Sequence, residues 1–97
     1  MLFVAAERPF RFIRGVEFAE YEFPNDNLVV YLFNPFGPGV LRPMLQNLQR
    51  SIDLHPRHVV VLLLWPVHGS LVAEMPTMRP YKLTRRYHIY QTARWRE

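Results

Sequence analysis

The chain has 97 residues, 49% of them hydrophobic and 21% charged, which is enough for one small globular domain and argues against intrinsic disorder. Its net charge is +4 and its pI is near 10.0, so acidic partners such as nucleic acids have to be considered. No apolar run approaches the roughly 20 residues that cross a bilayer, and residues 1–6 are too short for a signal-peptide core. The absence of cysteine excludes disulfides and a cysteine nucleophile. We therefore expect a cytoplasmic protein without a membrane segment.

The first elements along the chain are short. Residues 10–14 are rich in aromatic and basic side chains, follow Pro9 and stop at Gly15, a pattern that predicts a strand. Residues 17–23 place aromatic side chains among acids in a loose alternation and are expected to form a loop or an irregular edge. Residues 24–27 read Pro-Asn-Asp-Asn, a turn signal directly before a long apolar run.

Two unbroken apolar runs dominate the sequence, at residues 28–33 and 59–65. A helix-length segment separates them, and unbroken apolar strands connected through a helix are typical of a parallel sheet covered on both faces. In such sheets, ligands bind beyond the carboxyl ends of the strands. The motifs Asn34-Pro35-Phe36 and Pro66-Val67-His68 follow the two runs. We expect both motifs to lie at one common edge of the sheet.

The segment between the runs predicts an amphipathic helix. Its apolar residues follow steps of three and four, which place them on one stripe facing the sheet. Pro43 is expected to lie in the first turn, where a missing N–H costs no helical hydrogen bond. The stripe consists of Val40, Leu41, Met44, Leu45, Leu48 and Ile52.

The C-terminal part combines expected strands with basic residues. Residues 69–74 suit a short helical turn, and residues 81–91 suit one or two strands. The basic side chains either contact phosphate groups or form a solvated face, and the first interpretation makes the protein a small module that binds nucleic acid or a protein partner. These residues are Arg79, Lys82, Arg85, Arg86, Arg94 and Arg96.

The stretch LVVYLFNPFGPGVLRPMLQNLQRSIDLHPRHVVVLLLWPVH resembles the C-terminal half of a class I S-adenosylmethionine-dependent methyltransferase domain. In that family, a buried fourth strand ends in an (Asn/Asp)-Pro-(aromatic) element, and a helix and a fifth strand follow. Residues 86–91 resemble its last, antiparallel strand. The resemblance covers residues 10–91 and implies an α/β fold. It predicts a truncated Rossmann-like sheet, mostly parallel with a C-terminal antiparallel strand, forming one partial domain over residues 1–97.

The resemblance also assigns site residues. Asn34, Pro35 and Phe36 correspond to the family's motif beside the methyl donor and the substrate, and polar groups there would orient the acceptor for transfer. Glu17 corresponds to the acid that receives the adenine amino group of S-adenosylmethionine, although an exposed loop acid is an equal alternative. The family's glycine-rich cofactor loop has no counterpart, because the only glycines are Gly15, Gly37, Gly39 and Gly69.

This departure implies a methyltransferase-like chain that is inactive or incomplete alone. Without the family's first strands, residues 28–33 would form an apolar edge, and we expect such an edge to drive self-association or pairing with the missing half. His68 suits acid–base chemistry at the strand ends or, alternatively, a partly buried structural role. His55 and His58 have no carboxylate or cysteine near them in sequence, so no metal site is expected.

Overall fold

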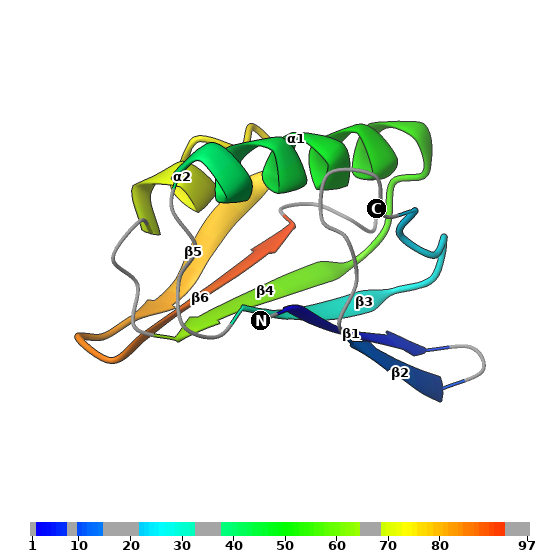
Figure 1. Ribbon diagram of the computed structural model, residues 1–97, viewed down its shortest axis with the longest axis horizontal. Helices are drawn as coiled ribbons and strands as arrows, with labels where there is room; N and C mark the ends of the chain where they lie inside the picture. The colour runs from blue at the N-terminus through cyan, green and yellow to red at the C-terminus, as the bar shows by residue number, and fades with distance from the viewer. Residues whose placement is uncertain (1, 8–9, 15–21, 33–37, 65–68, 93–97) are drawn as a thin grey trace.

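The computed structural model describes residues 2–7, 10–14, 22–32, 38–64 and 69–92. Within these ranges, a six-stranded sheet forms one layer and two helices form a second layer on one of its faces (Figure 1). The strand order is β2-β1-β3-β4-β6-β5. The elements are β1 (Leu2–Glu7), β2 (Phe10–Arg14), β3 (Leu28–Leu32), α1 (Pro38–Leu54), β4 (Val59–Leu64), α2 (Gly69–Ala73), β5 (Met78–Leu83) and β6 (Tyr87–Thr92).

The two apolar runs form the centre of the sheet. β3 and β4 are parallel neighbours, with Leu28 opposite Val59 and Leu32 opposite Leu63. The helix α1 connects them, because parallel neighbours need a crossover rather than a tight turn. The prediction that these segments lie side by side and point the same way is therefore confirmed. Their carboxyl ends reach the same edge of the sheet.

The predicted fold class is nevertheless wrong, because β3–β4 is the one parallel pair among the described strands. The sheet is mixed and mostly antiparallel. Two residues separate β1 from β2, and three separate β5 from β6. Such short connections can join only antiparallel neighbours. A truncated Rossmann-like sheet, mostly parallel, is thus not what this chain forms.

The strand β1 was not predicted, and it removes the exposed edge that the sequence suggested. Residues 2–7 lie antiparallel to β3, with Val4 opposite Val30 and Ala6 opposite Leu28. Val4 and Ala6 are buried. β3 is consequently paired on both sides, and the sheet edges within the described residues are β2 and β5. Self-association through an open edge of β3 loses its structural basis.

The helix α1 packs its apolar stripe onto the sheet, as predicted. The buried members of the stripe are Leu41, Met44, Leu45, Leu48 and Ile52. They join Val30, Leu32, Val61 and Leu63 in one hydrophobic core. The helix starts two residues before the predicted stripe, so Pro43 is its sixth residue and lies beyond the first turn. The carbonyl of Gly39, four residues earlier, therefore receives no N–H from Pro43.

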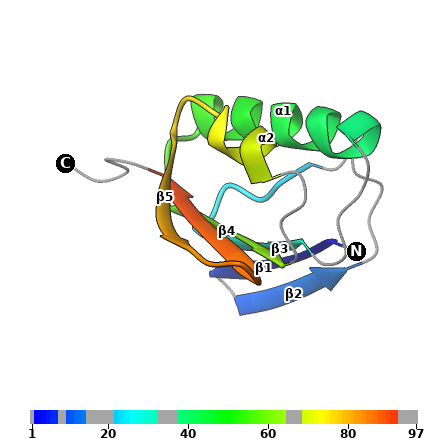
Figure 2. The ribbon, with the colours of Figure 1, turned by 90° about the vertical axis from the view of Figure 1, so that its left-hand side faces the viewer.

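The described helices cover one face of the sheet (Figure 2). Burial alternates along β4, where Val59, Val61 and Leu63 are buried while the residues between them are half-buried. The expectation that both faces of the apolar strands are covered is therefore wrong for the described part of the chain. The half-buried apolar side chains of β3, β4 and β6 on the second face are Val29, Tyr31, Val60, Leu62, Leu64, Tyr87 and Ile89.

A buried arginine ties the loop before β3 to the end of α1. The Arg57 guanidinium donates to the backbone carbonyls of Asp26 (2.8 Å), Pro24 (2.7 Å), Ser51 (3.0 Å) and His55 (2.7 Å). It also donates to Ser51 Oγ at 2.8 Å. All five of its N–H groups are thus used. Ser51 lies in the last turn of α1 and His55 directly follows it, and a positive charge is favourable at this end of a helix.

The backbone of Arg57 extends the same junction to β6. Thr92 Oγ1 donates to the Arg57 carbonyl and accepts from the backbone N–H of Val59, both at 3.1 Å. Burial lowers the pKa of Arg57, and the negative charge of Asp26 opposes that change. The loop, the helix end and two strands therefore meet at one residue that the sequence pattern did not single out.

Candidate functional site

The site predicted from the sequence lies where β3 and β4 end. The described strands stop at Leu32 and Leu64, and the helices α1 and α2 begin at Pro38 and Gly69. The residues predicted to act there lie outside the described residues, so the structure neither brings them together nor separates them. These residues are Asn34, Pro35, Phe36 and His68; Glu17, predicted separately to receive the adenine amino group, also lies outside the described residues.

A described polar pair lies on β6, toward this edge of the sheet: His88 and Tyr90. His88 lies opposite Leu63, and Tyr90 lies opposite Val61, so both belong to the helix-covered face. The Tyr90 hydroxyl and His88 Nδ1 share a hydrogen bond of 3.2 Å. Their rings meet edge to face, with centroids 5.9 Å apart. Residues two apart on a strand share one face, but nothing in the sequence indicates that the polar atoms of these two residues pair.

Tyr90 provides a test of this buried environment at high pH. Its side chain is buried, and the desolvation raises its pKa above the ordinary value of 10.0. An unfolded tyrosine loses its proton near pH 10, whereas the folded one keeps it to higher pH. The protonated Tyr90 side chain therefore makes its full contribution to the free energy of unfolding below pH 10, and this contribution is lost as the pH rises above 10. We expect urea unfolding midpoints to fall more between pH 9 and pH 11 for the wild type than for Tyr90→Phe. Equal losses in the two proteins would contradict this assignment.

The remaining described histidines form no metal site. His58 Nε2 lies 3.3 Å from Gln91 Oε1, and the His58 backbone N–H donates to Asn27 Oδ1 at 3.0 Å. His55 is exposed. Within the described ranges, no three His, Cys, Asp or Glu side chains lie together in a way that could hold a metal ion. His58 therefore contributes to the junction between the loop, β4 and β6, whereas the His55 side chain is exposed.

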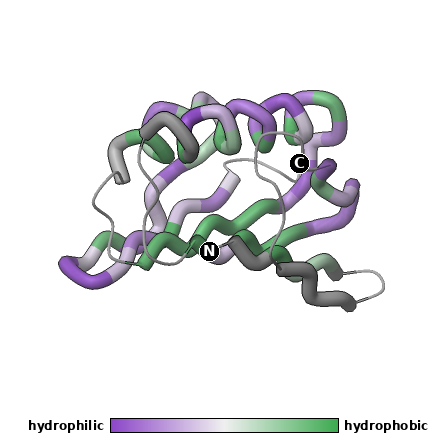
Figure 3. The backbone as a smooth tube through the Cα atoms, in the orientation of Figure 1, coloured by the Kyte–Doolittle hydropathy of each residue, from purple (hydrophilic) through white to green (hydrophobic). Residues whose placement is uncertain are grey.

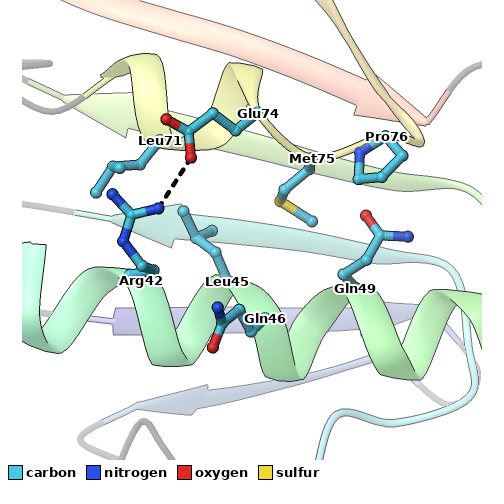
Figure 4. A pocket seen from close by; sticks show the side chains of 8 residues that line it. All are labelled: Arg42, Leu45, Gln46, Gln49, Leu71, Glu74, Met75 and Pro76. Atoms are coloured by element: carbon cyan, nitrogen blue, oxygen red, sulfur yellow. Dashed lines mark hydrogen bonds and ion pairs between the residues drawn. The ribbon is translucent and has the colours of Figure 1, made fainter.

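A small cavity lies between α1 on one side and α2 with the segment that follows it on the other (Figure 4). Its volume is about 180 Å³, below the roughly 300–1,000 Å³ of small-molecule sites. At one end, Arg42 and Glu74 form an exposed ion pair of 2.9 Å. At the other, Thr77 Oγ1 donates to Gln49 Oε1 at 3.0 Å. We interpret this cavity as an imperfect packing contact between the helices rather than a ligand site.

The most distinctive charged surface is the hairpin of β5 and β6. Five consecutive residues of β5, Arg79 to Leu83, are exposed. The turn after them carries Arg85 and Arg86, both exposed. Figure 3 shows that this turn is strongly hydrophilic, whereas β3 and β4 are hydrophobic along most of their length. The sequence predicted basic residues here, and the structure gathers the described ones on one edge hairpin.

No protein-family model matches the chain, and neither the curated proteins nor the solved structures give a significant match. Among the described helices, none has the length and apolar character to cross a membrane.

Proposed function

We propose that the chain is related to the C-terminal half of S-adenosylmethionine-dependent methyltransferase domains and is incomplete as an enzyme by itself. The observation that supports this is the arrangement of residues 28–92. β3, α1 and β4 form a parallel strand–helix–strand unit, and β6 lies antiparallel between β4 and β5. The strand that carries Asn34-Pro35-Phe36 at its end, the helix and the next strand follow one another as the resemblance implies. We also propose a cytoplasmic location, which suits a chain without cysteine.

The described residues beside β3 do not fit the methyl donor. The sheet position next to β3 is taken by β1, which runs antiparallel to it and whose end at Leu2 lies beside Leu32. The sequence has no glycine before Gly15, so no glycine-rich turn follows this strand. Without such a turn, backbone N–H groups cannot approach the cofactor closely. The proposal therefore assigns to this chain the acceptor side of a site, and no catalytic step.

A titration with S-adenosylmethionine tests both parts of the proposal. We expect calorimetry to detect no tight one-to-one binding. We expect NMR spectra of the ¹⁵N-labelled protein, at millimolar cofactor, to show small shift changes confined to the strand-end edge, at amides such as those of Leu32, Leu64 and His88. The changes should disappear in Asn34→Ala. They should persist in Asn47→Ala, a change about 14 Å along α1 from its start at roughly 1.5 Å per residue.

The outcomes distinguish the relation to methyltransferases from the incompleteness of the chain as an enzyme. Tight binding would show that the chain is not incomplete. Shift changes that are absent at the edge, or identical in Asn34→Ala and the wild type, would overturn the relation to methyltransferases.

A further inference from the structure

The β5–β6 hairpin carries a concentrated positive charge that the proposed methyltransferase relation does not use. Arg79, Lys82, Arg85 and Arg86 are all exposed. The sequence has no Asp or Glu from residue 75 to residue 96. Within the described part of the chain, no acidic side chain forms an ion pair with any of these four residues. Acidic side chains within the described ranges therefore do not neutralise the charge of the hairpin.

The hairpin also exposes large apolar side chains next to these charges. Tyr81 is 67% exposed and Leu83 is 55% exposed. Tyr81 follows Arg79 by two residues and precedes Lys82, on an edge strand that pairs only with β6. An exposed tyrosine among cations on an open strand can stack on an unpaired base while its neighbours neutralise phosphates.

The tip of the hairpin is held in one conformation by hydrogen bonds. The Thr84 backbone N–H donates to the Tyr87 carbonyl at 2.8 Å, and Thr84 Oγ1 donates to the same carbonyl at 3.0 Å. Thr84 Oγ1 also accepts from the backbone N–H groups of Arg86 (3.2 Å) and Tyr87 (3.0 Å). At the base of the hairpin, Arg79 Nη1 donates to the carbonyls of Pro76 (3.0 Å) and Met78 (2.9 Å). A preformed backbone lowers the entropy that binding would cost.

The shape of the hairpin fits a linear polyanion. From Arg79 to Arg85 the cations span about 20 Å at roughly 3.3 Å per residue, enough to follow several nucleotides. In Figure 1 the turn of the hairpin extends beyond the helices. The cations are thus distributed along an accessible ribbon and are not gathered in a pocket for one small anion.

We propose that the β5–β6 hairpin binds single-stranded nucleic acid, with the four cations on the phosphates and Tyr81 stacked on a base. A duplex hides its base faces, so the exposed tyrosine favours a single strand. This inference is independent of the methyltransferase relation, because it uses neither the strand-end edge nor the cofactor.

Fluorescence anisotropy with a labelled 12-nucleotide oligo-uridine RNA tests the proposal. The logarithm of the association constant should fall with the logarithm of salt concentration with a slope of about −3, from roughly −0.7 for each of four phosphates. Arg85→Gln/Arg86→Gln should weaken binding at least tenfold at 50 mM salt and reduce the slope by about 1.4. Tyr81→Ala should weaken binding at least fivefold, and Tyr81→Phe should bind like the wild type.

A matched control removes two positive charges elsewhere. Arg42 and Arg50 are exposed on α1, so Arg42→Gln/Arg50→Gln changes the net charge as much as the hairpin variant does. We expect its affinity to stay within twofold of the wild type. Equal losses in both double variants would overturn the site, because net charge alone would then explain binding. Equal affinity for a 12-base-pair duplex, no effect of Tyr81→Ala, or preference for anionic phosphatidylserine vesicles over the RNA would also overturn it.

Discussion

Arg57→Met is expected to lower the free energy of unfolding by about 3–5 kcal/mol, the cost typical of removing one partner from a buried charged network. The guanidinium makes five hydrogen bonds, four of them to backbone carbonyls. Methionine fills a similar volume but donates none. Arg57 is 7% exposed, so water reaches the abandoned carbonyls poorly. Because small domains have a total stability of about 5–15 kcal/mol, much of the protein should unfold under mild denaturant.

Urea unfolding followed by circular dichroism measures this loss, and two further variants locate its cause. Arg57→Lys keeps the charge but has three donors and no planar fork, so its stability should lie between those of the wild type and the methionine variant. Ser51→Ala removes one acceptor, Oγ, and should cost about 0.5–1.5 kcal/mol. If the methionine variant unfolded within 1 kcal/mol of the wild type, the junction would not hold the loop to the helix as described.

The sequence predicted those helices and strands whose apolar residues recur with a clear period or form an unbroken run. Residues 28–32 and 59–64 of the two apolar runs form the parallel neighbours β3 and β4, and the stripe from Leu41 to Ile52 forms the buried face of α1. Residues 10–14 became β2 with the predicted bounds. Each of these patterns lies within one element or within the strand–helix–strand unit of β3, α1 and β4. Residues close together in sequence were therefore sufficient to predict these elements.

The pairings with distant partners could not be predicted in the same way. β1 is six residues long and contains two alanines, so its pattern is weak, and nothing local indicates that it lies antiparallel beside β3. The role of Arg57 could not be predicted, because most of its acceptors are backbone carbonyls, one of them 33 residues away. Every residue has a backbone carbonyl, so the residue types do not indicate which carbonyls accept these hydrogen bonds. The predicted fold class was wrong because it also depended on distant pairings. The short connections β1–β2 and β5–β6 make these strands antiparallel, and the unexpected strand β1 lies antiparallel to β3.

For the candidate sites, too, the sequence indicated the residue types but not their positions in space. The strand-end motif was identified by residue type, but Asn34, Pro35 and Phe36 lie outside the described residues, so their role stays a prediction. The basic C-terminal residues were visible as a charge cluster. Their placement on one exposed hairpin, with Tyr81 beside them and Thr84 fixing the turn, depended on strand pairing. The sequence therefore identified the charged groups, and the fold showed that they lie together on the surface of the β5–β6 hairpin.

Leu48→Ala is expected to be the second strongly destabilising change, with a loss of about 2–5 kcal/mol. Leu48 lies in the middle of α1, is fully buried and belongs to the core shared with β3 and β4. Truncation removes apolar contacts and leaves a cavity that the helix and the sheet cannot close, because strands on both sides hold β3 and β4 in place. Thermal unfolding should show a midpoint lowered by roughly 10 °C or more, at about 4–8 °C per kcal/mol for a domain of this size.

The same helix offers a matched control for this experiment. Leu54 is the last residue of α1 and is 75% exposed. Leu54→Ala makes an identical chemical change, yet it should alter the free energy of unfolding by less than about 0.5 kcal/mol. The contrast isolates burial from helix propensity, since both variants replace leucine with alanine in one helix. Similar small losses at both positions would mean that α1 does not pack on the sheet, and the two-layer arrangement would have to be abandoned.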